Sequence, residues 1–311
     1  MSELFNKYLY FTSNDLFQHL RFRDTTVILS FLMACFLFQV SHKLLSMEYD
    51  GSHAELNDVD RKTLDDGEWL NDAVVDYFNY SRVDEHADDG VRFHVLSSLM
   101  YIKLSDHCAR PLYCNVPDCI NRDMQLIDYK PVHSWYQDLL RNEFVLVPMR
   151  VGGNHWVLGV VCLPNESGTD TEVPERPEKP MPCRMSAILL FDSLKNDRLI
   201  TTYSAKLRAY LNCVWHFCYK MGMNMPMREF TEENCPTIAV DIEQQTNMCD
   251  CGLYVIKATE VFMQRMADMR KFSLFDDAEK QEISGMFRKD IAIAGTNYRG
   301  TLREFINGQM K

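Results

Sequence analysis

The sequence predicts an α+β fold in which a mixed central sheet is flanked by helices. Three short apolar segments, 144–149, 156–162 and 187–191, are typical of buried strands. Two longer segments, 201–221 and 253–268, have the length and spacing of helices, the first amphipathic and the second apolar along most of its length. Strands and helices that alternate in this way favour one mixed domain around a common core.

Further elements follow from the same patterns. Apolar residues at helical spacing within 70–78 predict a helix that Asn71 or Asp72 could cap. The apolar segment 95–104 predicts another helix, and the alternation in 237–243 predicts a strand. The more polar C-terminal tail is expected to be helical. The part before about residue 140 is therefore expected to be mainly helical.

Composition restricts the possible functions. With 311 residues, of which 46% are hydrophobic, the chain can bury a sizeable core. The net charge of −11 argues against a nucleic-acid binder and favours basic partners. The eleven cysteines are odd in number and scattered, which is typical of a reducing compartment. We therefore expect an intracellular protein.

The N-terminal segment 25–42 leaves two interpretations open. Its 18 residues carry no formally charged side chain, slightly fewer than the roughly 20 that span a bilayer. Basic residues precede it, which would keep the N-terminus in the cytosol. The segment is either a membrane tether or a packed or poorly ordered extension. We assign residues 1–45 to this extension and 46–311 to the globular domain.

Two regions within the globular part are irregular. Residues 163–185 hold five of the eleven prolines and five acidic residues, which predicts a surface loop or insertion. Zinc is conceivable in a second region, but its spacings do not match the usual paired-ligand patterns. Its candidate ligands are His107, Cys108, Cys114 and Cys119. We expect no metal and no cofactor.

A candidate nucleophile lies where a polar loop changes abruptly into an apolar helix. The loop begins with Gln244 and Gln245, and the helix is expected to begin at or just after Cys251. A cysteine at a helix N-terminus lies at the positive end of the macrodipole, which favours thiolate over thiol. Because such a cysteine is more often a packed core residue, the interpretation requires a base, an orienting acid and an oxyanion donor.

Other segments supply these groups. His155 begins a strand after a glycine-rich turn, and Asp192 follows a very apolar strand. Alone, each is more often an ordinary surface or turn residue. Together they match a template in which Cys251 attacks, His155 takes its proton and Asp192 orients His155. The Gln245 amide and backbone N–H groups near Cys251 could stabilise the oxyanion.

Four motifs in order resemble the ubiquitin-like-protein-specific cysteine proteases, the Ulp/SENP (sentrin-specific) family. The motifs are Trp69-Leu70-Asn71-Asp72, Asn154-His155-Trp156, Phe191-Asp192-Ser193-Leu194, and Gln245 with Asp250-Cys251-Gly252. The resemblance covers about residues 50–290. It implies a papain-like cysteine protease fold whose active site lies in the cleft between a helical and a sheet-containing half. It also implies that His155, Asp192 and Cys251 are the triad and Gln245 the oxyanion-hole residue.

The resemblance also implies substrate contacts. Trp69 and Trp156 resemble the aromatic pair that clamps the Gly-Gly tail of the modifier, and Asp72 resembles a residue that meets a basic side chain on it. A flat aromatic channel can select glycines because it excludes residues with a Cβ. Core packing is the alternative explanation for both tryptophans.

The long insertion between His155 and Asp192 resembles the Ulp2-like branch of the family. The resemblance implies a SUMO-specific thiol protease that cleaves after Gly-Gly, in deconjugation from lysine, chain trimming or precursor processing. The alternatives are a protease for another ubiquitin-like modifier, an inactive SUMO-binding module and a membrane-tethered structural protein. We expect a monomer that is nuclear and/or cytoplasmic, binds SUMO or SUMO-conjugated proteins, and does not bind nucleic acid.

Overall fold

The structure is a computed structural model that describes residues 43–49, 52–84, 90–99, 101, 142–162, 186–195, 197–220, 230–272 and 275–309. Several predicted features lie outside these residues: the apolar segment 25–42, the insertion 163–185, and the candidate zinc ligands His107, Cys108, Cys114 and Cys119. The boundary near residue 45 stays a prediction.

Five strands form the central sheet, in the order β3-β4-β5-β6-β7. They are β3 (Phe93–Val95), β4 (Phe144–Val151), β5 (His155–Cys162), β6 (Ala187–Phe191) and β7 (Thr237–Val240). The two outer pairs are parallel and the two inner pairs are antiparallel, so the sheet is mixed as predicted. The last strand ends at Val240 and not at residue 243.

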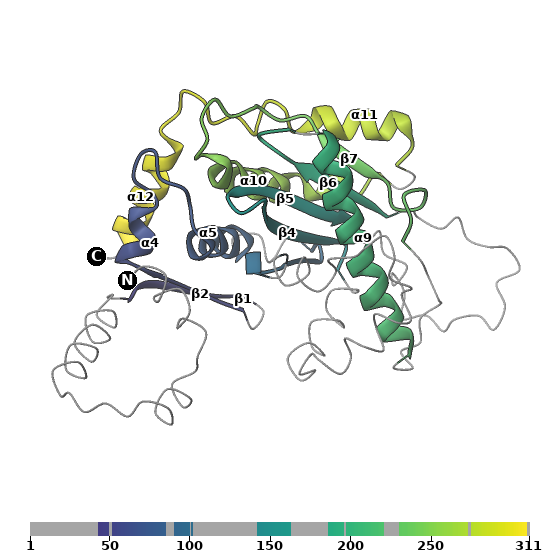
Figure 1. Cartoon of the computed structure of the whole chain (residues 1–311), viewed down its shortest axis with the longest axis horizontal. Coiled ribbons are helices and arrows are strands. Elements are labelled where there is room, and N and C mark those ends of the chain that lie inside the picture. The colour runs from purple at the N-terminus through teal and green to yellow at the C-terminus, as the bar shows by residue number, and fades with distance from the viewer. Residues whose placement is uncertain are drawn as a thin grey trace, which may run out of the picture. The chain divides into compact units, whose positions relative to one another are not determined.

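Both faces of this sheet are covered, which explains why its strands are apolar without a polar face. On β5, Trp156 and Leu158 belong to the core that includes α10 (Cys251–Met269). The intervening Val157 belongs to a second core, which includes Leu207 of α9 (Asp197–Lys220). The sheet therefore lies between the two helices that the sequence predicted (Figure 1).

Among the described residues before 140, the N-terminal part holds strands as well as helices, which the sequence pattern did not predict. A hairpin of β1 (Lys43–Tyr49) and β2 (Ser52–Asn57) precedes the short helix α4 (Asp58–Lys62). The side chain of Asn57 caps α4 by accepting from two backbone N–H groups, as its residue type favours. Trp69 follows α4 in a loop and is not carried by a helix.

Helix α5 (Asp72–Asp84) confirms the helix predicted from residues 70–78. Of the two proposed caps, Asn71 caps it, because its Oδ1 accepts from the Val74 N–H at 3.1 Å. The helix predicted over residues 95–104 is wrong at its first residue, because Val95 ends β3 and pairs with Leu146 of β4, but residues 98, 99 and 101 are helical. A short apolar run does not distinguish a strand from a helix, and here pairing with the longer strand β4 makes Val95 a strand residue.

Two helices in the C-terminal tail, α11 (Asp277–Met286) and α12 (Tyr298–Gln309), confirm its predicted helical character. Helix α12 lies beside α4, and Arg61 of α4 donates to Asn307 of α12 at 3.5 Å (Figure 1). The long helix α10 contacts both α5 and β5. It therefore joins the N-terminal part of the fold to the sheet.

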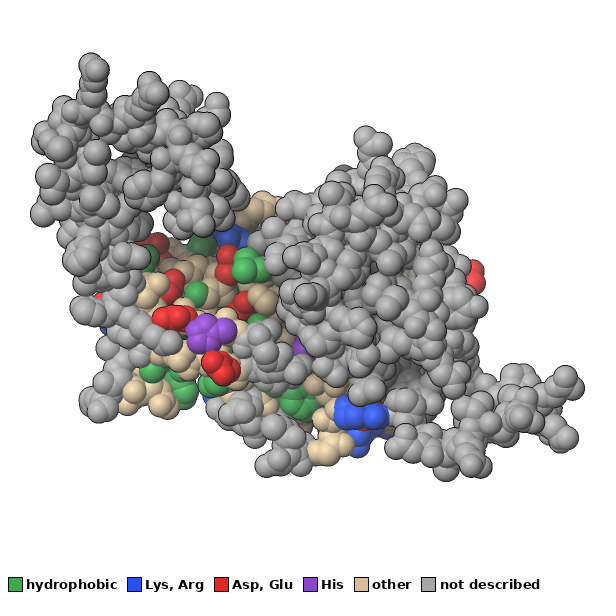
Figure 2. Space-filling view, turned by 90° about the horizontal axis from the view of Figure 1, so that it is seen from below, with side chains coloured by type: hydrophobic (Ala, Val, Ile, Leu, Met, Phe, Trp, Pro, Cys, Tyr) green, Lys and Arg blue, Asp and Glu red, His purple; other side chains and the backbone are tan. Residues whose placement is uncertain are grey.

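The hairpin carries a small charged group. His53 on β2 lies 3.7 Å from Glu48 and 3.4 Å from Glu55, and Figure 2 shows acidic side chains beside a histidine on this face.

Over the ranges given above, no helix combines the length and apolar character needed to cross a membrane.

Candidate active site

The strand order brings distant segments to one end of the sheet. β5 begins at His155 and runs antiparallel to β6, so Asp192, which follows β6, lies at the same end. β7 runs parallel to β6 and its chain emerges there too. Gln245, beyond β7, donates its backbone N–H to the Ser193 carbonyl at 2.9 Å. Helix α10 then begins at Cys251.

The turn between β4 and β5 sets the position of His155. Gly152 and Gly153 have φ values of 59° and 91°, which L side chains adopt at a cost. The turn allows Val151 to pair directly with His155 across the antiparallel strands. Glycines are therefore required here because the chain must reverse immediately before the histidine.

The structure places His155 and Asp192 in direct contact. His155 Nε2 lies 2.7 Å from Asp192 Oδ1, and Asp192 is only 4% exposed. The Leu194 N–H donates to the same carboxylate oxygen at 2.9 Å. Two donors therefore fix the carboxylate, and the carboxylate in turn fixes the imidazole ring.

This environment raises the pKa of His155 to about 9. Burial is the largest influence and lowers the pKa, but the hydrogen bond and charge of Asp192 and the corresponding interactions with Cys251 outweigh it. The protonated imidazole is therefore the favoured form at neutral pH. An imidazolium beside a cysteine stabilises a thiolate.

Cys251 is the first residue of α10 and is 1% exposed. Its Sγ lies 3.8 Å from the carbonyl oxygen of Asn154, the residue before His155. Asp192 occupies Nε2 of the histidine, so Nδ1 is the nitrogen left for Cys251. The N-terminus of the helix supplies a positive end at the sulfur, as expected from the sequence.

Gln245 is buried and held at both ends of its carboxamide. Its oxygen accepts from the Ser193 hydroxyl at 2.6 Å, and its Nε2 donates to the Asn247 carbonyl at 2.6 Å. That bond uses one of the two amide N–H groups. Gln244 donates to the Asp192 carbonyl at 3.0 Å. Both glutamines therefore tie the loop before Cys251 to the loop that carries Asp192.

The two tryptophans are linked to the same loops. Trp156 is buried, and its Nε1 donates to the Leu70 carbonyl at 3.0 Å. Trp69 is 47% exposed, and its Nε1 donates to the Met248 carbonyl at 2.7 Å. Trp156 is thus mainly a core residue, whereas Trp69 presents a surface next to the loop that precedes Cys251.

Asp72 begins α5 and faces a cation of the protein itself. Arg150 Nη1 lies 3.5 Å from Asp72 Oδ1, and Arg150 Nε donates to the Gly153 carbonyl at 2.8 Å. The contact predicted between Asp72 and a basic side chain of the modifier would compete with this pair. Arg150 also links Asp72 to the turn that precedes His155.

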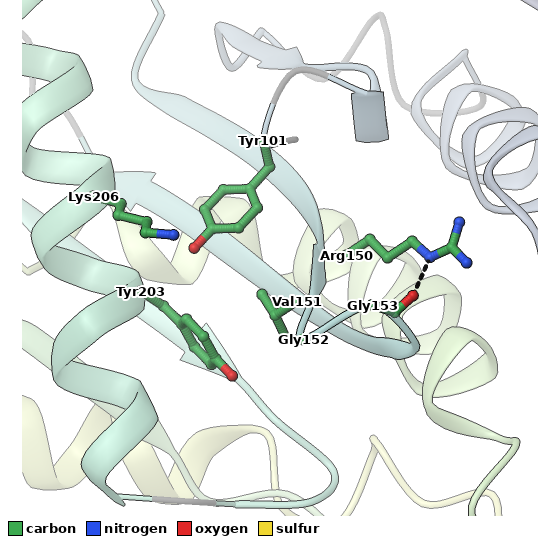
Figure 3. Close-up of a pocket in the computed structure, with 7 residues that line it drawn as sticks. All are labelled: Tyr101, Arg150, Val151, Gly152, Gly153, Tyr203 and Lys206. Carbon is green, nitrogen blue, oxygen red and sulfur yellow. Dashed lines mark hydrogen bonds between the residues drawn. The ribbon is translucent and has the colours of Figure 1, made fainter. Parts of the chain in front are cut away.

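A cavity of about 330 Å³ is lined in part by this turn. Figure 3 shows that Lys206 and Tyr203 of α9 face Tyr101 across it, and that the Arg150 side chain extends away from these residues. Lys206 Nζ lies 5.8 Å from the Tyr101 ring centroid. None of the catalytic candidates lines this cavity.

Some residues of the site were not identified from the sequence. Asn154, Ser193 and Asn247 contribute a carbonyl or a hydroxyl to the contacts around Cys251 and Gln245. Asn154 and Ser193 lie within the motifs that carry the resemblance, directly beside His155 and Asp192, so their positions in these motifs could have indicated them. In the part of the chain that the structure describes, no group of three or more His, Cys, Asp or Glu side chains could hold a metal ion.

A cysteine at a helix start, with a histidine and an aspartate from adjacent strands, defines the site of a cysteine protease. Residues 68–294 match the model of the Ulp1 protease family, C-terminal catalytic domain. The chain belongs to this family, which confirms the resemblance noted from the four motifs.

Individual relatives agree with that assignment. Sentrin-specific protease 7 of Mus musculus is 25% identical over 254 residues, a match covering 66% of this chain and 23% of that protein. Ubiquitin-like-specific protease 2 of Schizosaccharomyces pombe is 21% identical over 248 residues, covering 71% and 35% respectively. The similarity to Ulp2 proteins is consistent with the predicted branch. The chain spans about a quarter to a third of the length of these relatives.

A solved structure is similar in fold. The crystal structure of the de-sumoylating protease superposes with a TM-score of 0.58 at 19% identity, covering 86% of this chain and 91% of that one. At this identity the similarity is one of fold alone, and it confirms the predicted α+β cysteine protease architecture.

Proposed function

We propose that the chain is a SUMO-specific thiol protease that hydrolyses the bond after the C-terminal Gly-Gly of SUMO. The observation that carries this proposal is the 2.7 Å contact between His155 and Asp192 at the sheet end where α10 begins with Cys251. The names of the relatives, which are sentrin-specific and ubiquitin-like-specific proteases, support the choice of substrate.

In the acylation step the Cys251 thiolate attacks the carbonyl carbon of the terminal glycine. The C–S bond forms as the carbonyl π electrons move to oxygen, and this oxyanion is stabilised by the Gln245 amide and the N–H of Cys251. His155, protonated because Asp192 stabilises its charge, gives its proton to the leaving amine as the C–N bond breaks. A thioester of SUMO with Cys251 remains.

In the deacylation step His155 is neutral and takes a proton from water as the oxygen attacks the thioester. The tetrahedral oxyanion again lies in the site of Gln245, and its collapse breaks the C–S bond. The glycine leaves as a carboxylic acid that loses its proton to solvent, and Cys251 leaves as a thiolate. The thiolate and the imidazolium of His155 are then restored together.

The tail is proposed to pass over the exposed face of Trp69 and to reach Trp156, which is buried, only at an edge of its ring. Both tryptophans bond to backbone carbonyls of loops next to the nucleophile, at Met248 and Leu70. Such fixed aromatic rings leave room for glycine and exclude residues with a Cβ. Asp72 is proposed to meet a basic side chain of the modifier in place of Arg150.

The test is cleavage of a SUMO–fluorophore substrate by the wild-type protein and by Cys251→Ser. Cys249→Ser is the matched control, because Cys249 lies two residues away and is partly exposed. We expect release of the fluorophore by the wild type and by Cys249→Ser, and none by Cys251→Ser. Lack of cleavage by the wild type, or equal cleavage by Cys251→Ser, would overturn the proposal.

Two alternative functions predict different results with reactive probes. A protease for another ubiquitin-like modifier would react with the C-terminal electrophilic probe of that modifier and ignore SUMO. An inactive SUMO-binding module would bind SUMO without alkylation of Cys251 by iodoacetamide. The presence of a residue of the required type at His155, Asp192, Cys251 and Gln245 favours the active protease.

We propose deconjugation or chain trimming over precursor processing, on the basis of the similarity to Ulp2 proteins. We also propose that the protein acts as a monomer in the nucleus and/or cytoplasm, since its many scattered cysteines suit a reducing compartment. Comparing SUMO chains with a SUMO precursor as substrates tests the first statement, and light scattering and imaging of the tagged chain test the second.

A further inference from the structure

Arg299 of α12 lies at the junction of three segments that are far apart in the sequence. It is 8% exposed, and its Nη1 donates to the carbonyls of Thr63 and Asp65, at 2.9 and 3.1 Å. Its Nη2 donates to Asp250 Oδ1 at 2.7 Å and to the Cys249 carbonyl at 3.5 Å. One guanidinium thus joins the loop before Trp69 to the loop before Cys251.

Asp250 is the N-cap residue of α10, but its carboxylate does not cap the helix. An aspartate here ordinarily accepts from an N–H of the first turn. In this structure, Oδ1 accepts from Arg299 and Oδ2 accepts from Asn247 Nδ2 at 2.7 Å. The carboxylate is therefore turned away from the helix that begins with Cys251.

Asp250 nevertheless carries a charge beside the nucleophile. Burial alone would raise its pKa, but the bonds from Arg299 and Asn247 outweigh burial and lower it. An anion next to Cys251 opposes formation of a thiolate, and an anion that capped α10 would also occupy N–H groups at the helix start. Both effects would weaken the site unless another group opposed them.

We propose that Arg299 is a positioning residue that holds the Asp250 carboxylate away from the N-terminus of α10 and neutralises its charge beside Cys251. The first N–H groups of the helix then remain available to the thiolate and to the oxyanion. The inference rests on the proposed role of Cys251 as the nucleophile.

Among the residues that the structure describes, the other charged and titratable groups near Cys251 do not perform this task. His155, paired with Asp192, lies on the side of the sheet and supplies the imidazolium. Cys249 contacts Asp250 through its Sγ at 3.8 Å, and burial and the charge of Asp250 raise the pKa of Cys249, so it stays a neutral thiol at neutral pH. Arg299 is therefore the cation that opposes Asp250.

The experiment is a double-mutant cycle of Arg299→Met and Asp250→Asn, read out by the rate at which iodoacetamide alkylates Cys251 as a function of pH. We expect Arg299→Met to raise the midpoint of this profile by about one pH unit, and so to slow alkylation near pH 7 by about tenfold. Adding Asp250→Asn should return the midpoint to within about 0.3 units of wild type, because the unopposed anion is gone.

Asp250→Asn alone keeps Arg299 and its carbonyl bonds, so this variant decides the question even if Arg299→Met does not fold. Its midpoint should equal that of the wild type or fall below it, since a negative charge has been removed. A higher midpoint would overturn the proposal. So would an Arg299→Met profile that is unchanged, or one that Asp250→Asn fails to restore. Cys249→Ser in every variant restricts alkylation at this loop to Cys251.

Arg303→Met is the matched control, because Arg303 lies one turn further along α12 and pairs with Asp65 at 3.4 Å on the surface. We expect its alkylation profile to equal that of the wild type. Alkylation requires no SUMO, so this test and the SUMO test fail independently. If the wild type cleaves SUMO but the alkylation profile of Arg299→Met is unchanged, only the role of Arg299 is refuted. If the double-mutant cycle gives the expected midpoints but the wild type does not cleave SUMO, only the choice of substrate is refuted.

Discussion

Nε2 of His155 lies 2.7 Å from Oδ1 of Asp192, and this pairing determines which nitrogen can serve Cys251. Because Asp192 engages Nε2, Nδ1 is the ring nitrogen left to exchange a proton with the Cys251 sulfur or with the leaving amine. Because Asp192 is fixed by the Leu194 N–H as well, the ring orientation is defined before substrate binds.

The first prediction concerns pH. In the proposed mechanism the active form is the Cys251 thiolate with protonated His155, and the pKa of His155 is raised to about 9. Activity should therefore be retained at neutral pH and be lost as pH rises through about 9, where the imidazolium loses its proton. Measuring kcat/KM on SUMO–fluorophore from pH 6 to 10 locates the alkaline limb, and a limb near the ordinary histidine pKa of about 6.5 would contradict this account.

The second prediction concerns the aspartate. Asp192→Asn retains the shape of the side chain but removes the charge that holds the His155 proton. We expect kcat/KM to fall by about 100-fold and the alkaline limb to move to lower pH. Asp241→Asn is the control, because its carboxylate pairs with Arg288 at the surface, at 3.1 Å, and should leave both quantities unchanged. If the alkaline limb of kcat/KM lay at the same pH in Asp192→Asn as in the wild type, a group other than Asp192 would determine its position.

The third prediction concerns the glycine after the nucleophile. A Cβ on Gly252 would meet the Leu70 Cβ at 2.9 Å, closer than packed side chains allow, and Leu70 holds the Trp156 indole through its carbonyl. Gly252→Ala should therefore destabilise the fold by about 1–3 kcal/mol and reduce kcat. Denaturant unfolding and SUMO cleavage measure the two effects.

Gly285 in α11 provides the control for this substitution. A Cβ there meets no atom within 4 Å, so Gly285→Ala should be neutral or should stabilise the helix by up to about 1 kcal/mol. If the two alanine variants were equally stable, the close approach of α10 to Leu70 would not be a constraint.

The fourth prediction concerns the exposed tryptophan. Trp69→Phe keeps an aromatic face but removes the 2.7 Å bond to the Met248 carbonyl. We expect KM for SUMO–fluorophore to rise several-fold with a smaller change in kcat, and Trp69→Ala to raise KM further. Val59→Ala, which changes another exposed apolar side chain, should leave KM unchanged. A fall in kcat alone would indicate that Trp69 acts on the loop before Cys251 and not on the tail.

Much of this site could be predicted from the sequence because its parts lie at the ends of regular elements. The strands that carry His155 and Asp192 are continuous apolar runs, and α10 begins at the cysteine where polarity changes. The Arg299 contact could not be predicted, because Arg299 lies 48 residues beyond Cys251 in a polar helix and its role depends on tertiary packing.

The errors have a similar cause. The sequence does not indicate the β1–β2 hairpin, because among its described side chains only Ala54 and Leu56 are buried and the alternation is therefore weak. The pattern around Val95 also fits a helix, because a short apolar run is ambiguous until its pairing partner is known. The local sequence pattern predicts the long elements correctly. It fails where pairing with a strand far away in the sequence determines the secondary structure, as at Val95.

The fifth prediction concerns a buried carboxyl outside the active site. Asp76 of α5 is 8% exposed and accepts from the Ser98 N–H and the Ser97 hydroxyl, both at 2.8 Å. Burial outweighs these bonds and raises its pKa to about 6. A raised pKa means that the folded state binds the proton more tightly than the unfolded state. The stability it contributes is therefore full below about pH 4 and is lost as pH rises through about 6.

Asp76→Asn cannot titrate, so it should flatten this part of the pH dependence. The difference in free energy of unfolding between pH 4 and pH 7 should become smaller by up to about 3 kcal/mol, the upper limit set by a shift of about two units. Asp66→Asn, which removes an exposed carboxyl, should retain the wild-type dependence. Urea unfolding at each pH measures all three proteins, and parallel curves for wild type and Asp76→Asn would refute the assignment. Asp76 joins α5 to the residues that follow β3, so the loss of stability should appear first as increased hydrogen exchange in that segment.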